Sequence, residues 1–382
     1  MQTHFDYIII GAGLSGYTMA FRMSQDSFFE HKTIALIDPN FSKKNDRTWC
    51  FWETAPDLFE SVVSNQWKNI LVKGNQLQQP IAIAPYSYKK IESEDFYAFA
   101  KAQLSQYSNI TLIQDSVVHL KDTTPTITVT TNQKTYTAQK VLDSRYNPTL
   151  LTTQKQAIVL QQHFVGWFIK TSKNVFDPEV ASYMDFSVPQ NGNCRFMYVL
   201  PTSKTEALLE YTLFSKDFLS LAEYENAIKD YLKELGVIEY EIVSKERGSI
   251  PMTTYDFTKH NTENTIHIGT AGGWTKASTG YTFKHTLKKS EQLISFIKSG
   301  KSFTQYTLKN KWNFYDAVLL QVLSSHNNRG KEIFTRMFKK GKAAHIFKFL
   351  DEESSFKDEL KVILSAPKWL FIKAALKVIF SR

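Results

Sequence analysis

Cysteine is almost absent from this chain of 382 residues, which contains only Cys50 and Cys194. Two cysteines cannot form a disulfide framework or, by themselves, a four-ligand zinc site, so we expect a reducing cytoplasmic environment and no metal ion. Long apolar runs are missing too, because no uncharged stretch reaches the roughly 18 residues of a membrane span. The first residues carry no basic segment and no cleavage-site pattern. We therefore expect neither secretion nor insertion across a membrane.

Glycine and proline are sparse, at 15 and 11 residues, while 42% of the residues are hydrophobic and 22% are charged. This composition is typical of a globular chain and excludes a disordered or fibrous protein. The length suffices for two or three folding units and excludes a single small binding module.

Acidic residues are outnumbered by basic ones, 37 to 46, and most of the resulting net charge of +9 lies at the C-terminus. Residues 331–382 contain 12 basic and 6 acidic residues, and residues 369–380 are rich in Trp, Leu, Ile and Phe. A basic apolar helix suits an anionic membrane surface better than a nucleic acid, which we do not expect as a partner. A C-terminal helix docked on the core, with solvated lysines, is the alternative.

The N-terminus contains a nucleotide-binding pattern. A buried strand over 5–10 leads into Gly11, Gly13 and Gly16, followed by a helix over 17–23 and a second strand over 33–37 that ends at Asp38. In such a unit the glycines permit a tight turn, close approach of a pyrophosphate and helix–strand packing, and the acid binds a ribose. These four residues therefore predict a dinucleotide cofactor.

Later segments favour FAD over NAD. An alternating hairpin over 126–130 and 134–138 leads to a strand over 140–143, which predicts a β-meander. A meander within a Rossmann sheet resembles the FAD domain of the hydroxylase and glutathione-reductase type flavoproteins. That resemblance places Val118 against the adenine through its backbone.

A second glycine-rich turn follows a strand that begins at residue 265 and precedes a helix over 282–297. We expect this turn to hold the flavin end of the cofactor. Its residues are Gly269, Thr270, Gly272 and Gly273. Because no second complete GxGxxG unit exists, we expect no dedicated NADPH domain.

The pattern predicts an α/β fold with α+β insertions. Strand-like runs over 161–170, 181–188, 196–200 and 207–214, with an amphipathic helix over 221–235, indicate an antiparallel substrate sheet. We predict three parts: a discontinuous Rossmann-type FAD-binding domain over 1–45, 100–150 and 262–300, a substrate-binding domain over 46–99 and 151–261, and a helical C-terminal region over 301–382.

Two acids are candidates for proton transfer. Glu210 shares one strand face with Leu208, and a carboxyl among apolar neighbours has a raised pKa that suits a proton donor near neutral pH. An exposed glutamate on an edge strand fits the pattern as well. Asp185, in Tyr183-Met-Asp-Phe-Ser187, is a second candidate, with a turn or structural hydrogen bond as the alternative. Aromatic residues, 14% of the chain, suit a long apolar ligand and a positive charge over ring faces.

Four segments together resemble the bacterial lycopene β-cyclases, and with the N-terminal pattern they span about residues 5 to 285. They are Asp46-Arg-Thr-Trp-Cys-Phe-Trp52, Leu208-Leu-Glu-Tyr-Thr212, Gly248-Ser-Ile-Pro-Met252 and the long stretch from Gly269 to Phe283. The resemblance implies that Glu210 is the catalytic acid/base and groups Arg47 with the cofactor-binding residues. The family's second acid is Tyr211 here, so Asp185 is the fallback partner.

The resemblance further implies a redox-neutral isomerase. It would convert the ψ-ends of lycopene to β-ionone rings, giving β-carotene through γ-carotene, and would need reduced FAD with external NAD(P)H as reductant. The enzyme would work on the inner face of the cell membrane as a peripheral protein. An FAD-dependent oxidoreductase acting on a polyene, either a monooxygenase or an isoprenoid-chain reductase, is the main alternative. A flavin-bearing carotenoid carrier is the other.

Overall fold

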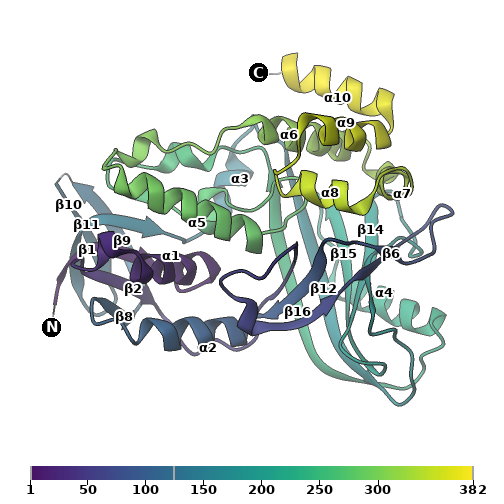
Figure 1. Ribbon diagram of the computed structural model, residues 1–382, viewed down its shortest axis with the longest axis horizontal. Helices are drawn as coiled ribbons and strands as arrows, with labels where there is room; N and C mark the ends of the chain where they lie inside the picture. Colours follow the sequence, from purple (N-terminus) through teal and green to yellow (C-terminus); the bar gives the residue numbers. More distant parts are fainter. Residues whose placement is uncertain (1, 124, 381–382) are drawn as a thin grey trace.

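The computed structural model describes residues 2–123 and 125–380, and in these residues two seven-stranded sheets lie side by side with helices packed around them (Figure 1). A small three-stranded sheet lies near the junction. This mixed α/β arrangement confirms the predicted fold class. We call the first of the two large sheets the cofactor sheet and the second the substrate sheet, after the parts predicted above.

The first sheet has the strand order β8-β2-β1-β11-β10-β9, with β17 beside β11. The strands β8, β2, β1, β11 and β17 run parallel, whereas β9, β10 and β11 form the predicted antiparallel meander. The bounds are β1 His4–Ile10, β2 Ile34–Asp38, β8 Ile110–Gln114, β9 Val117–Thr123, β10 Thr126–Thr131, β11 Thr135–Asp143 and β17 Thr265–His267. Every residue of β2 is buried, as expected for an inner strand of a parallel sheet covered on both faces.

Three helices cover one face of this sheet, namely α1 (Leu14–Gln25), α2 (Ser93–Leu104) and α5 (Phe283–Lys298). Tyr7 and Ile9 of β1 pack into the core beneath these helices. Ile8 and Ile10 point to the opposite face, where they pack against the meander. This alternation follows from the two-residue period of a strand.

The second sheet has the order β16-β12-β15-β14-β13-β5-β6. Its bounds are β5 Asn69–Lys73, β6 Ile81–Ala82, β12 Val159–Thr171, β13 Val180–Asp185, β14 Cys194–Pro201, β15 Glu206–Ser215 and β16 Tyr240–Thr253. The predicted strands over 161–170, 196–200 and 207–214 lie within β12, β14 and β15, and the predicted helix is α4 (Leu221–Glu234). The predicted strand over 181–188 corresponds to β13 but extends three residues past its end. The strand β16 was not predicted, because half of its residues are exposed and its sequence lacks a clear apolar alternation.

The two faces of the second sheet pack against different helices. One face lies on α4, whereas the face that carries Glu210 is covered by α6, α7 and α8. The helices of the C-terminal region are α6 Lys311–Ser325, α7 Gly330–Lys340, α8 Ala343–Leu350, α9 Phe356–Ser365 and α10 Lys368–Phe380. A short α3 (Thr149–Thr153) connects the two sheets along the chain.

The small sheet β3-β7-β4 contributes to the cores of both large sheets. Its bounds are β3 Thr48–Glu53, β4 Val63–Trp67 and β7 Ser87–Glu92. Phe51 and Ile91 pack with the cofactor sheet, whereas Trp52 and Tyr88 pack with the substrate sheet. The segment 46–99, predicted to belong to the substrate domain, therefore divides its side chains between the two cores.

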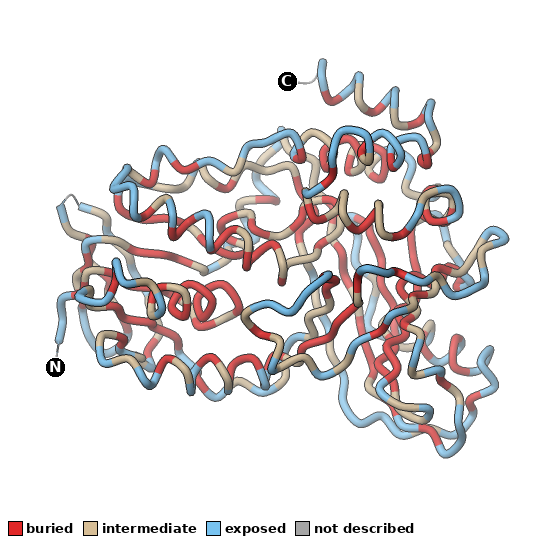
Figure 2. The backbone as a smooth tube through the Cα atoms, viewed as in Figure 1, coloured by how far each residue is buried: buried red, intermediate tan, exposed pale blue. Residues whose placement is uncertain are grey.

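The last helix, α10, lies at the edge of the molecule with one side buried and the other exposed (Figure 2). Leu370, Ala374 and Val378 pack against α6, which is the docked arrangement given above as the alternative. The outward side nevertheless carries Trp369, Ile372, Leu376, Ile379 and Phe380. Within residues 2–123 and 125–380, none of the helices has both the length and the apolar character needed to cross a membrane.

Candidate active site

Two of the three glycines in the first turn leave no room for a side chain, whereas the third faces open space. A Cβ added to Gly11 would lie 2.1 Å from Ser144 Oγ, and one on Gly16 would lie 1.8 Å from the Gly11 carbonyl oxygen. A Cβ on Gly13, at the start of α1, would meet no atom of the described residues within 4 Å. This free space at a helix N-terminus fits a pyrophosphate approaching the backbone.

Asp38 holds the glycine turn in place. Its Oδ2 accepts hydrogen bonds from Ala12 N at 2.7 Å and from Lys43 Nζ at 2.8 Å, and its Oδ1 accepts one from Asn40 N at 2.8 Å. Lys43 also donates to the Ala12 carbonyl oxygen at 2.9 Å. Since a carboxylate can accept about four hydrogen bonds, one position remains for a ribose hydroxyl. Lys43, which the sequence analysis missed, places a positive charge beside the turn.

The second glycine-rich turn packs against the first. Gly269 and Gly273 have positive φ angles of 62° and 72°, and a Cβ on Gly269 would lie 2.5 Å from Ser15 Oγ in the first turn of α1. A Cβ on Gly272 would lie 2.2 Å from the His267 carbonyl oxygen. Together with Thr270, Gly13, Ser15 and Gly269 line one cavity, so the structure brings both predicted glycine turns to the same site. These groups fit the pyrophosphate and the polar chain of FAD.

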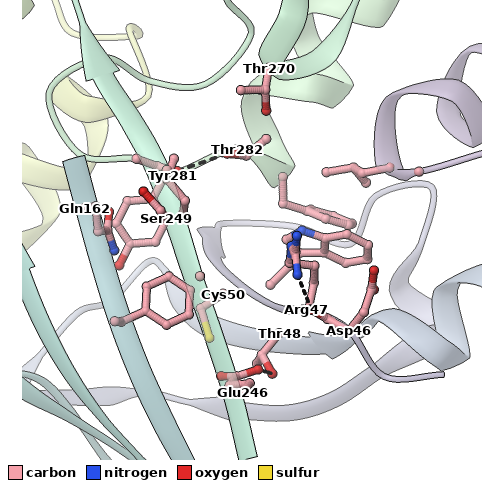
Figure 3. Close-up of a pocket in the computed structure, with 18 of the residues that line it drawn as sticks. Asp46, Arg47, Thr48, Cys50, Gln162, Glu246, Ser249, Thr270, Tyr281 and Thr282 are labelled. Atoms are coloured by element: carbon pink, nitrogen blue, oxygen red, sulfur yellow. Dashed lines mark hydrogen bonds between the residues drawn. The ribbon is translucent and has the colours of Figure 1, made fainter. Parts of the chain in front are cut away.

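The cavity has a volume of about 450 Å³ and extends from the two glycine turns to the substrate sheet. Its far end is formed by Glu210 of β15, Glu246 of β16, and Thr48 and Cys50 of β3. Figure 3 shows Thr48 and Glu246 meeting at this end, with Arg47 nearer the middle of the cavity. The proposed proton donor and the glycine turns thus line one cavity.

Glu210 is the acid that the sequence analysis singled out, and it faces this cavity. Its Oε1 accepts a hydrogen bond from Thr212 Oγ1 at 2.7 Å. Burial raises the pKa of Glu210 well above its usual range, and the neighbouring charge of Glu246 raises it further. A carboxyl with a raised pKa retains its proton near neutral pH and can serve as a general acid.

Glu246 is a second cavity acid that the sequence analysis missed. Its Oε2 accepts a hydrogen bond from Thr48 Oγ1 at 2.8 Å, and burial raises its pKa. It precedes the segment Gly248–Met252 by two residues, but nothing in the local pattern shows that it faces Glu210. The pairing of β16 with β12 places it there.

Aromatic side chains form the wall beside Glu210. Tyr88, Tyr198 and Tyr281 line the cavity, and the hydroxyl oxygens of Tyr88 and Tyr281 are 3.1 Å apart. The rings of Tyr183 and Tyr281 are stacked, with centroids 6.3 Å apart. Burial raises the pKa of all four phenols, so they stay neutral. Neutral ring faces of this kind stabilise a positive charge and exclude water.

Asp185 lies beside α4, away from the cavity that holds Glu210. It accepts hydrogen bonds from Ser187 N and from the hydroxyl of Tyr231 on α4, both at 2.8 Å, and pairs with Lys73 at 3.4 Å. Its backbone is paired with Met197, which belongs to the α4 core. Among the described residues, Asp185 is not one of those that line the cavity. The structural hydrogen bond considered above therefore accounts for Asp185, and we assign it no part in the chemistry.

The remaining predicted residues are distributed around the cofactor end. Arg47 lines the cavity, but Val118 is exposed on β9 and does not line it in the described part of the chain. The backbone before the meander nevertheless lies beside the first turn, because Asp115 N donates to the Asp38 carbonyl oxygen at 3.2 Å. Contact between Val118 and an adenine stays a prediction.

Solved structures with similar folds include proteins whose descriptions name a flavin. A geranylgeranyl bacteriochlorophyll reductase-like protein from Thermoplasma acidophilum superposes with a TM-score of 0.60 at 12% identity, covering 98% of this chain and 96% of that chain. The flavin-dependent brominase Bmp2 has a TM-score of 0.62 at 12% identity over the whole of both chains. The halogenase PltM in complex with phloroglucinol and FAD has a TM-score of 0.57 at 11% identity, covering 96% and 87%. These similarities establish the overall fold of the chain.

Sequence comparison is more specific. A lycopene beta-cyclase of Pantoea ananas is 26% identical over 260 residues, which cover 66% of this chain and 64% of that protein. The match therefore spans slightly less than two thirds of that relative. The family model described as lycopene cyclase protein matches residues 6–376, nearly the whole chain. The resemblance noted in the four sequence segments is thereby confirmed, and this chain belongs to the lycopene cyclase family.

Proposed function

We propose that this protein is an isomerase that converts the ψ-ends of lycopene to β-ionone rings, giving β-carotene through γ-carotene without net oxidation or reduction. The observation that carries this proposal is the position of Glu210. It lies with a raised pKa in the same cavity as the glycine turns that fit FAD. Family membership and the Pantoea relative support the substrate class.

The reaction begins with proton transfer from the Glu210 carboxyl to the terminal double bond of the polyene. This leaves a tertiary carbocation, which the neighbouring double bond captures to close a six-membered ring. Loss of a ring proton then forms the new double bond and returns a proton to the carboxylate. Atoms and electrons balance, so the product is an isomer of the substrate. The tyrosine wall protects the cation from water and faces it with π electrons.

Gly13, Lys43, Gly269 and Thr270 would hold the cofactor, with the free space at Gly13 accepting the pyrophosphate. When bound and reduced, FAD would supply negative charge and π electrons that stabilise a cation. We propose external NAD(P)H as the reductant.

Lycopene is insoluble in water, so the enzyme must meet it at a membrane. The outward side of α10 carries exposed apolar residues together with Lys368, Lys373 and Lys377, and α9 adds exposed Phe356 and Leu364. Apolar side chains and lysines on one exposed helix suit an anionic membrane surface. We propose that these helices dock the protein peripherally on the inner face of the cell membrane.

The second candidate function is an FAD-dependent oxidoreductase, favoured by the similarity of the fold to a reductase-like protein and to halogenases. Incubation of the reduced holoenzyme with lycopene, followed by mass analysis of the carotenoids, separates the two. A cyclised product of unchanged mass supports the proposal, whereas a product that has gained oxygen or hydrogen refutes it. Retention of carotenoid without any product, in the parent protein and in Glu210→Ala alike, would indicate a carrier instead.

A further inference from the structure

One row of four residues crosses the substrate sheet and faces the cavity. Tyr198 of β14 is paired with Glu210 of β15, which is paired with Gly166 of β12, which in turn is paired with Glu246 of β16. Directly paired residues of neighbouring strands lie on the same face of a sheet. Glu210 and Glu246 therefore stand on the same face, on the two strands that flank β12.

The absence of a side chain at Gly166 allows the two acids to meet. Residues two strands apart have backbones about 9.5 Å apart, too far for short side chains that stand upright to touch. A Cβ on Gly166 would lie 3.1 Å from Glu246 Cγ and 3.4 Å from its Oε1, so the Glu246 side chain extends across the glycine. Its carboxyl lies near enough to Glu210 for each acid to affect the pKa of the other, and among the described residues its buried Oε1 has no other hydrogen-bond partner, so this oxygen can accept a proton from Glu210.

A hydrogen bond between two carboxyl groups requires a proton on one of them, because two carboxylates have no donor. The surroundings favour Glu210 as the donor. Burial raises the pKa of both acids, but the charge of Glu246 raises the pKa of Glu210 further, whereas hydrogen bonds and the charges of Lys90 and Arg47 oppose the rise in the pKa of Glu246.

The other titratable groups around the pair do not compete for this proton. Burial raises the pKa of the Cys50 thiol to about 12 and that of the Tyr88 and Tyr198 phenols well above their usual range, so these groups stay neutral. The nearest buried cation, Lys90, is already paired with Glu92 at 2.9 Å.

We propose that Glu246 is a positioning residue that shares one proton with Glu210 and keeps Glu210 in its acid form at neutral pH. This inference rests on the cyclase function proposed above. When Glu210 donates its proton to the polyene, a new C–H bond forms and the pair carries two negative charges. Two carboxylates on the wall of the cavity stabilise a carbocation formed beside them. Loss of the ring proton to the pair then restores the single shared proton.

Glu246→Gln tests this proposal, because it keeps the shape of the side chain and removes its charge. The rate of cyclisation by the reduced holoenzyme is measured from pH 5 to pH 10 for the parent and the variant. Parent activity falls at high pH, where the pair loses its shared proton. Without the charge of Glu246, Glu210 loses its proton more easily, so the alkaline limb moves to lower pH by about one pH unit or more. At a pH above both limbs, the variant is then about tenfold slower than the parent for each pH unit between them.

Glu246→Asp serves as the matched control because it keeps the charge on a shorter side chain, and its alkaline limb should lie between those of the parent and Glu246→Gln. An unchanged pH profile in Glu246→Gln overturns the proposal. A loss of activity that is equal at every pH overturns it as well, because this is the result that a purely structural role predicts.

Infrared spectroscopy separates failure of this proposal from failure of the cyclase function and needs no turnover. At pH 7 the difference spectrum between the parent and Glu210→Gln should show the carbonyl stretch of a protonated carboxyl, and taking the difference removes the band of Asp351, whose pKa of about 7 leaves it partly protonated in both proteins. In Glu246→Gln the same band should disappear at a lower pH than in the parent. If lycopene is not cyclised but this band behaves as described, the pair exists and the cyclase function is wrong. If lycopene is cyclised and the parent shows no such band, the shared proton is wrong.

Discussion

Substitution of Gly13 tests cofactor binding without disturbing the fold. Gly13 has φ of −94°, which any residue can adopt, and a Cβ there would meet no atom of the described residues within 4 Å. Gly13→Val should therefore leave the apoprotein folded. Loss of a favourable residue at the start of α1 costs about 1 kcal/mol, and reduced freedom of the unfolded chain offsets about 0.4 to 1 kcal/mol.

The same substitution should weaken FAD binding enough for the cofactor to be lost during purification, because the valine side chain fills the space that the pyrophosphate needs. Loss of two charge-assisted hydrogen bonds to the phosphates costs about 3 kcal/mol or more, which corresponds to about a hundredfold weaker binding. Gly16→Ala is the matched control. Its Cβ would lie 1.8 Å from the Gly11 carbonyl oxygen, so it should destabilise the fold itself, by about 3 kcal/mol or more.

Two measurements read out these effects: urea unfolding of the apoprotein followed by circular dichroism, and flavin released per mole of purified protein. The parent should bind flavin. Gly13→Val should keep the parent's unfolding midpoint but lose the flavin. Gly16→Ala should have a lower unfolding midpoint and should also lose the flavin. A flavin-replete Gly13→Val protein refutes the placement of the pyrophosphate, and an unfolded Gly13→Val protein refutes the claim that this glycine faces free space.

Three further predictions concern the acids and the tail. Glu210→Gln should abolish cyclisation while flavin stays bound. The raised pKa of Glu210 lowers the free energy of unfolding as pH rises above about 4.3, so Glu210→Gln should also melt at a higher temperature than the parent at pH 8. Undiminished turnover in this variant contradicts the assignment of Glu210 as the proton donor. Asp351 has a pKa raised by burial to about 7, so its contribution to stability is full below about pH 4 and is lost as pH rises through 7. Asp351→Asn still accepts the hydrogen bond from Trp52 Nε1. Its free energy of unfolding, compared with that of the parent, should rise by up to about 4 kcal/mol as pH increases from about 4 to 8. Equal urea midpoints for the two proteins at pH 8 argue against this prediction. Exchange of Trp369 and Ile372 for serine should weaken sedimentation with anionic liposomes without changing the melting temperature. Leu370→Ser, on the packed side of α10, should lower the melting temperature instead. If the Trp369 and Ile372 variant binds liposomes as the parent does, docking through α10 is refuted.

The sequence alone predicted much of the local structure, because turns, strands and helices depend on residues that are close together in the chain. The glycine spacing at 11, 13 and 16 predicts a tight turn and a close approach wherever it follows a buried strand. The alternation over 126–138 predicts the meander, and the 3.6-residue period over 221–235 predicts α4. Glu210 was recognised for the same reason, since its apolar neighbours lie within a few residues along the strand.

The tertiary structure alone decided which distant residues meet. Glu246 joins Glu210 because β16 pairs with β12 in a register that sets both acids opposite Gly166, whereas Asp185 ends on the α4 face. A change of one residue in such pairing turns every side chain to the other face, and no local pattern fixes that choice. Lys43 likewise reaches the glycine turn only because β2 lies beside β1. Contacts of this kind depend on strand order and register, and these arise only when the whole chain packs.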